Sequence, residues 1–281
     1  MTADRKKGLL SASAGSVFWG SSGIAGQFLL INEHIAPAWL TFFRLLTAGF
    51  LLLLLTHFFK GNISALWKDR KDRRDLLIFS AFGMLGTQYG YFASIQYSNA
   101  PTATILEYLM PILIIFWYCL SEKRRPRMRE LFCAFFAIAG TALIATGGDP
   151  STLVIPPEGL AVGLISAVGA ACMSIVPTKI LPIYGSSIVT GSAMFASGVV
   201  ISVFVRPWES VPAFDASGLI ALAILIVVGS FLAYNLYMQG VKDIGSVRAS
   251  LIGTVEPVSA TVTSALVLGT VFAPTDLIGF A

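Results

Sequence analysis

The amino-acid sequence predicts an all-α integral membrane protein, and three observations support this prediction. Hydrophobic residues make up 56% of the 281 residues and charged residues only 12%, about half the charged share of a soluble domain. The mean hydropathy is +0.78. The apolar residues also fall into separate runs of about 20 residues, the length that spans a bilayer as a helix. A soluble fold could not hide so much apolar surface, whereas a bilayer solvates it.

Nine runs are long enough to span a membrane. They are residues 9–31, 35–58, 76–97, 100–120, 131–148, 159–178, 187–205, 218–240 and 246–272. The first run is too long for the core of a cleaved signal peptide, so we expect a retained helix. A tenth run begins at Thr275 and stops at Ala281, which is about 10 Å as a helix and too short to span. We therefore expect a ten-helix bundle whose tenth helix is truncated in this chain.

The basic residues predict a cytoplasmic N-terminus, because loops rich in Lys and Arg stay in the cytoplasm. With that orientation, 17 of the 19 Lys and Arg residues lie inside, most of them before the first run and in loops 60–75 and 121–130. Only Arg206 lies outside, and Arg44 lies within a helix. The net charge of +4 follows from this distribution, so it implies no nucleic-acid partner. We expect a multi-pass protein of the cytoplasmic membrane, with lipid contacts to the basic loops as a secondary role.

The two halves of the sequence show a weak similarity. A shift of 146 residues aligns Gly83 with Gly229, Tyr91 with Tyr237, Ala103 with Ala249 and Pro111 with Pro257. Four identities in 30 positions are near chance, but ATILEYLMPI and ASLIGTVEPV keep the residue class at most positions. Five helices in each half would invert the second copy in the membrane, as in many secondary transporters. We therefore expect repeats at 1–148 and 149–281; the alternative is two unrelated runs of helices.

Four motifs in order resemble the drug/metabolite transporter superfamily, EamA type. Trp19-Gly20 lies in the first helix, and P-x-x-L-T-F-F-R, residues 37–44, opens the second. NAPTATILEYLMPI (99–112) resembles the family's fourth helix, and LIGTVEPVSA (251–260) resembles the ninth. The chain departs from the family where L-G-T (268–270) replaces the usual L-G-E, and at Glu107, where relatives are often uncharged. These departures leave the subfamily open.

The resemblance covers essentially the whole chain and implies a fold and a role. The family has ten helices in two inverted five-helix repeats, with both termini cytoplasmic. Its members export amino acids, drugs and other metabolites, and some import solutes. The resemblance therefore implies a transport role without naming the solute.

Ionisable residues are rare in the helical runs, and burial in hydrocarbon makes them costly unless they are paired or hydrated. Glu107 lies about 10 Å from the outer face, and Glu256 lies near mid-depth of the equivalent helix in the second half. Both carboxylates could bind a cationic or zwitterionic solute, or take up and release protons. Alternatively, they accept hydrogen bonds or pair with Arg44 or Arg248 to hold helices together. Arg44, at the depth of Glu107, either forms that ion pair or extends to the interface.

Polar and aromatic side chains form the rest of the candidate site. Trp19 lies in the middle of the first helix, and Gln88 and Tyr91 share one face of the third, three residues apart. The other candidates are Tyr108, Tyr234 and Asn235. Aromatic faces attract organic cations and stack on planar rings; the alternative for each is ordinary packing.

Two prolines, Pro111 and Pro257, follow the two glutamates. A proline frees a carbonyl one turn earlier in its helix. We expect each to bend its helix, either as a hinge for rocking of the halves or as a static kink.

The same sequence leaves other function classes without support. It has no P-loop, and Cys119, Cys133 and Cys172 fit neither a zinc site nor a disulfide framework, so we expect no cofactor, no metal and no enzyme activity. The leading hypothesis is a secondary transporter that exports an amino acid or related metabolite by alternating access. Transport would be coupled to protons through Glu107. The protein would be a monomer or a homodimer. An organic-cation or drug carrier is the second hypothesis. An integral-membrane enzyme or scaffold without transport is the third.

Overall fold

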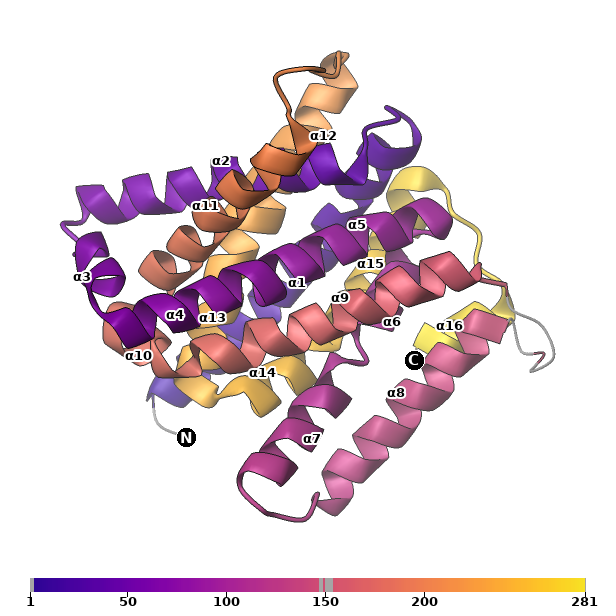
Figure 1. The fold of residues 1–281 in the computed structure, drawn as a ribbon. Coiled ribbons are helices and arrows are strands. Elements are labelled where there is room, and N and C mark those ends of the chain that lie inside the picture. The colour runs from indigo at the N-terminus through magenta and orange to yellow at the C-terminus, as the bar shows by residue number, and fades with distance from the viewer. Residues whose placement is uncertain (1–2, 147–148, 150–153, 281) are drawn as a thin grey trace.

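The computed structural model describes residues 3–146, 149 and 154–280, and it is helical over most of them (Figure 1). The first half of the chain contains α1 (Ala3–Ile31), α2 (Pro37–Phe58), α3 (Ile63–Lys68), α4 (Arg70–Ile78), η1 (Phe79–Leu85), α5 (Gly86–Tyr97), α6 (Ala100–Glu107), α7 (Met110–Ser121) and α8 (Met128–Thr146). The second half contains α9 (Pro157–Ile175), η2 (Val176–Lys179), α10 (Leu181–Tyr184), α11 (Ser186–Val205), α12 (Ala216–Ile226), η3 (Val227–Leu232), α13 (Ala233–Ile244), α14 (Ser246–Gly253), α15 (Val255–Leu268) and α16 (Pro274–Phe280). No strand occurs in this described part of the chain.

Eight helical segments of the described chain are long and apolar enough to cross a membrane. They are Arg5–Ile31, Pro37–Phe58, Ala100–Ser121, Met128–Thr146, Pro157–Lys179, Ser186–Val205, Ala216–Ile244 and Ser246–Leu268. The ninth predicted span, 76–97, is helical as the run α4–η1–α5, but it is not among these eight. Its polar and small residues, Gln88 and Gly90 among them, are buried in the bundle. The predicted all-α membrane fold is confirmed; residues 147 and 148 of the predicted fifth helix lie outside the described residues.

The same interruptions occur at corresponding places in the two halves. The third and eighth predicted helices each contain a π-helical segment, η1 and η3, and these hold the aligned glycines Gly83 and Gly229. The fourth and ninth predicted helices are each broken, between α6 and α7 and between α14 and α15. Each break comes just before Pro111 or Pro257, which cannot donate a backbone hydrogen bond to the preceding turn.

Helices from the two halves pack against one another through glycines. The largest packed pairs include α2 with α11, α1 with α13 and α15, and α5 with α9. At Gly20, a Cβ atom would lie 2.1 Å from the Ser259 Oγ atom, and at Gly49 it would lie 2.4 Å from the Phe195 backbone nitrogen. Such close approach of helices is typical of small residues in membrane bundles. The halves therefore form one interlocked bundle.

Two hydrogen bonds join helix ends that lie next to basic segments of the chain. The Tyr184 hydroxyl, before α11, donates to Asp72 Oδ2 of α4 at 2.7 Å, and this bond raises the pKa of Tyr184 to about 12. The Ser246 hydroxyl at the start of α14 donates to the Ser174 carbonyl near the end of α9, at 2.7 Å. In Figure 1 the N-terminus, α3 and α10 lie toward the same side. We refer to this side as the basic end.

We expect Gly49→Ala to lower the melting temperature of the detergent-purified protein by several degrees. The added methyl group would force α2 away from α11, and overpacking of this kind destabilises a fold by about 1–3 kcal/mol. The matched control is Gly86→Ala, where the new Cβ would lie 3.7 Å from the nearest atom, an ordinary contact. Equal melting temperatures for the two variants would contradict this account of the helix contact.

Candidate functional site

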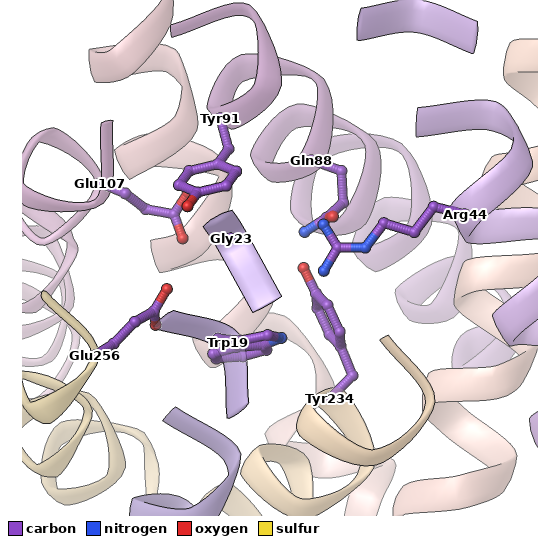
Figure 2. A pocket seen from close by; sticks show the side chains of 8 residues that line it. All are labelled: Trp19, Gly23, Arg44, Gln88, Tyr91, Glu107, Tyr234 and Glu256. Atoms are coloured by element: carbon purple, nitrogen blue, oxygen red, sulfur yellow. The ribbon is translucent and has the colours of Figure 1, made fainter. Parts of the chain in front are cut away.

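A small cavity lies between the halves, about midway along α1 (Figure 2). Its lining consists of Trp19, Gly23, Arg44, Gln88, Tyr91, Glu107, Tyr234 and Glu256. These side chains come from six different helices, and the sequence analysis selected all of them except Gly23. The cavity measures about 20 Å³, which is room for about one water molecule. The chain therefore brings two buried acidic side chains and one buried basic side chain around one small space.

Glu107 is the last residue of α6, and its side chain is buried. Its Oε2 atom accepts a hydrogen bond from the hydroxyl of Ser166, in the middle of α9. The same hydroxyl lies 3.1 Å from the Thr87 carbonyl. The sequence alone gave no reason to choose Ser166, because a serine on a small-residue helix face looks like packing.

Glu256 is the second residue of α15, and it is also buried. Its Oε2 atom accepts a hydrogen bond of 3.0 Å from the hydroxyl of Tyr108, which lies at the break after α6. Tyr108 therefore contacts Glu256 but does not itself line the cavity. Each glutamate therefore accepts a hydrogen bond from a hydroxyl in the other half of the chain.

Within the described residues, neither Arg44 nor Arg248 forms an ion pair with a glutamate, and the hydrogen-bond partners of Arg44 are uncharged. Nε donates to the Ser230 hydroxyl, and Nη2 donates to the Gly229 carbonyl at 2.7 Å. Both acceptors belong to η3, the π-helical segment. The guanidinium carbon also lies 5.2 Å from the ring centroid of Phe92, within cation–π distance. The predicted pairing of Arg44 with Glu107 is absent, because η3 supplies the acceptors instead.

Two buried polar atoms of the lining have no hydrogen-bond partner within the described residues. They are the Trp19 Nε1 donor and the Gln88 Oε1 acceptor. The Trp19 ring is held by Tyr234 and Tyr237, with ring centroids 4.6 and 4.7 Å away. Buried polar groups are nearly always paired, so this donor and this acceptor remain available to a further polar group in the cavity.

The remaining predicted residues lie away from this cavity. Asn235 Oδ1 accepts a hydrogen bond of 3.0 Å from the Ser187 hydroxyl of α11. Pro111 and Pro257 lie near the starts of α7 and α15, just after the helix breaks.

Gly23 lines the cavity, but the sequence analysis missed it. It lies one turn after Trp19, and a Cβ atom there would lie 2.5 Å from the Tyr91 hydroxyl. The spacing of four residues from Trp19 was the signal that could have revealed it.

Comparisons with known proteins agree on a transporter family. The sequence model of the "EamA-like transporter family" matches residues 6–146 and again 157–281. The chain is 34% identical over 274 residues to the "Uncharacterized inner membrane transporter YicL" of Salmonella typhimurium, covering 98% of this chain and 91% of the relative. It is 22% identical over 250 residues to the "Uncharacterized transporter YyaM" of Bacillus subtilis, covering 86% and 80%.

A solved structure titled "Crystal structure of protein" has the same fold. Its TM-score to this chain is 0.68 at 17% sequence identity, with 99% of this chain and 91% of the other covered. At that level of identity the likeness concerns the fold alone. It supports the predicted two-repeat, ten-helix architecture.

We expect Tyr108→Phe to lower the melting temperature, because a buried Glu256 carboxyl oxygen would lose its donor. Leaving such a group unsatisfied destabilises a protein by about 1–3 kcal/mol. Tyr237→Phe is the matched control. The Tyr237 hydroxyl is also buried, but its hydrogen-bond partner is the Ser174 hydroxyl, 3.4 Å away, and not a carboxylate. A larger loss of stability in the control than in Tyr108→Phe would show that the contact to Glu256 is unimportant.

Proposed function

Because the chain belongs to the EamA-like transporter family, we propose that it is a secondary active transporter for a small zwitterionic solute. The solute is an amino acid or a related metabolite, and the direction is export across the cytoplasmic membrane, with the N-terminus in the cytoplasm. One observation carries the proposal: two carboxyl groups and one guanidinium group line the same small cavity between the halves.

The acidic side of the cavity suits an ammonium group. Glu107 and Glu256 each accept one hydrogen bond in the described chain, so each has further acceptor capacity. The free Gln88 Oε1 atom adds a third acceptor at the same cavity. A primary ammonium group, which has three N–H donors, can be bound by these three acceptors.

The opposite side of the cavity suits a carboxylate. Arg44 uses Nε and Nη2 for η3, while its Nη1 atom makes no hydrogen bond within the described residues. The Trp19 Nε1 donor is also free and lines the same space. Charge-assisted hydrogen bonds to a carboxylate are among the stronger ones, so Arg44 would orient the solute.

The cavity is too small for such a solute, so the proposal requires the bundle to open. We propose that residues 1–148 and 149–281 are inverted five-helix repeats that rock around the site and expose it to each side in turn. The paired interruptions support this, because η1 and η3 and the two broken helices are places where both halves depart from regular α-helix at corresponding positions. Such π-helical segments are frequent at functional sites.

We also propose that Glu107 carries a coupling proton. Within the described residues no cation pairs with it, and a single serine hydroxyl holds it. A carboxyl in that setting can exchange a proton for the ammonium group of the solute, which makes the binding of the two mutually exclusive.

An organic-cation carrier is the second candidate, and the aromatic lining favours it. Trp19, Tyr91 and Tyr234 surround a cavity with two acidic groups and one basic group. Aromatic faces attract quaternary cations when they are shielded from water. In a cation carrier, Arg44 would only hold η3 in place through its hydrogen bonds and would not contact the solute.

Counterflow in proteoliposomes tests the transport proposal. Vesicles loaded with a mixture of the twenty common L-amino acids should accumulate a labelled zwitterionic amino acid, and tetraethylammonium should neither compete nor exchange. Accumulation of tetraethylammonium instead would support the cation carrier. Absence of counterflow with either group would favour a membrane protein that does not transport these solutes.

Glu107→Gln should abolish the effect of a pH gradient on uptake, while counterflow becomes slower but persists because Glu256 and Gln88 still bind the ammonium group. The amide keeps the size of the side chain and its hydrogen bond to Ser166, but it cannot release a proton. The measurement is solute uptake with and without an imposed pH gradient. Gradient-driven uptake equal to that of the wild type would exclude Glu107 as the coupling group.

A further inference from the structure

Ser166 joins three helices beside the central cavity through one hydroxyl group. It lies in the middle of α9 and is fully buried. Two acceptors lie within hydrogen-bond distance of this hydroxyl: the Oε2 atom of Glu107, at the end of α6, and the Thr87 carbonyl of α5, 3.1 Å away. Glu107 lines the cavity, and Thr87 directly precedes Gln88, which also lines it. The hydroxyl therefore links the cavity to the contact between α5 and α9.

One hydroxyl group cannot serve both acceptors fully. A serine hydroxyl has a single hydrogen and two acceptor sites. If Glu107 is ionised, Ser166 donates to the carboxylate, and the Thr87 carbonyl receives nothing from it. If Glu107 is protonated, its O–H donates to the Ser166 Oγ atom, and Ser166 donates to Thr87. Only the protonated form of Glu107 thus fills both contacts.

The second glutamate has a different environment. The Tyr108 hydroxyl donates to Glu256 at 3.0 Å and has no other hydrogen-bond partner among the described residues. This contact suits an ionised Glu256, and the charge of Arg44 at the same cavity balances it. With Glu107 protonated, the closed site carries no net charge, which lowers the cost of burying it in a membrane.

The other ionisable groups at the cavity do not bond to Glu107 within the described chain. Arg44 donates to η3, the Tyr91 hydroxyl lies 3.2 Å from that of Thr104, and Tyr234 reaches the cavity from α13. The remaining described ionisable residues of the helices packed against α6 do not line the cavity; they are Arg5, Lys6 and Lys7 of α1, Tyr89 and Tyr97 of α5, Arg129, Glu130 and Cys133 of α8, and Glu158 and Cys172 of α9. Ser166 is therefore the group that holds the Glu107 carboxyl.

The contact between α5 and α9 is tight around this hydroxyl. A Cβ atom at Gly169 would lie 2.4 Å from the Thr87 nitrogen, and one at Gly90 would lie 2.9 Å from the Ser166 nitrogen. Helix α5 belongs to the first half of the chain and α9 to the second. With the backbones this close, a hydrogen bond gained or lost between Ser166 and Thr87 acts directly on the contact between the halves.

We propose that Ser166 is a positioning residue that couples the protonation of Glu107 to the closure of the central cavity. In the protonated state, the hydrogen bonds from Glu107 to Ser166 and from Ser166 to Thr87 hold α5 against α9. When the proton passes to water, the Ser166 hydroxyl turns to the carboxylate, the link to Thr87 is lost and α5 can separate from α9. This rests on the proposed carrier function, in which the solute's ammonium group replaces the proton.

Infrared spectroscopy of the purified protein tests the protonation state. A protonated carboxyl group has a C=O stretching band that a carboxylate lacks. Glu107→Gln should remove one such band at neutral pH, and Ser166→Ala should shift its frequency because the acid loses its acceptor. Ser174→Ala is the matched control, since it removes a buried hydroxyl of the same helix whose partner is Tyr237, and it should leave the band in place. Bands of protonated carboxyl groups that Glu107→Gln leaves unchanged would overturn the proposal.

Cysteine labelling in detergent tests the coupling. In a background with Cys119, Cys133 and Cys172 changed to Ser, Gln88→Cys reports on the central cavity. Glu209→Cys, in an exposed turn, gives the intrinsic rate of a methanethiosulfonate reagent at each pH. The ratio of the two rates should rise about fivefold or more from mildly acidic to mildly alkaline buffer, because loss of the proton loosens the contact between α5 and α9.

Two variants assign this rise to the proposed link. Glu107→Gln should keep the ratio low in both buffers, since its amide donates to Ser166 and cannot lose a proton. Ser166→Ala should raise the ratio in acidic buffer and remove its dependence on pH, and Ser174→Ala should change neither. A ratio that still rises with pH in Ser166→Ala, as in the parent, would overturn the role of Ser166, even if that variant is less stable.

These measurements use no solute, so they separate the link from the carrier function. A ratio that rises with pH and requires Ser166, in a protein without counterflow of any amino acid, would support the link and contradict the carrier. Counterflow by a protein whose labelling ratio does not change with pH would leave the carrier intact and overturn the link.

Discussion

Three ionisable side chains lie inside a bundle whose outer surface faces hydrocarbon, and the need to satisfy them shapes the rest of the structure. Isolated charges in such surroundings are costly, so each requires groups supplied by the protein. Ser166 and Tyr108 serve the two glutamates, and η3 serves Arg44. In all three cases the partner comes from the other half of the chain. The hydrogen bonds at the site are therefore also the bonds that hold the halves together.

This coupling explains why the central cavity is small. Closing the halves around the charged groups excludes water and lets every hydroxyl reach its carboxylate. Separating the halves exposes the same groups to solvent or solute, which can replace the lost partners. The energetic difference between a closed and an open centre is therefore a difference between similar sets of hydrogen bonds. The rocking of the halves proposed above requires such a near balance.

The sequence predicted the fold well, since the apolar runs set the positions of the helices to within a few residues. It also selected most of the cavity lining, because Glu107, Glu256 and Arg44 are rare charges within apolar runs. It could not predict η3, whose residues look like ordinary helix, and so it could not predict the partners of Arg44. Asn235 was grouped with Tyr234, but adjacent helical residues point about 100° apart, so Asn235 faces α11.

The exchange of hydroxyls between the halves has a consequence for how such a chain arose and how it folds. Taken alone, neither half carries both an acidic group and the hydroxyl that supports it: Glu107 depends on Ser166, and Glu256 depends on Tyr108. If the halves are the repeats proposed above, a single ancestral repeat would need a second copy of itself to complete either one. During synthesis, the first half must wait in the bilayer with an unsupported carboxyl group until the helices of the second half have been inserted.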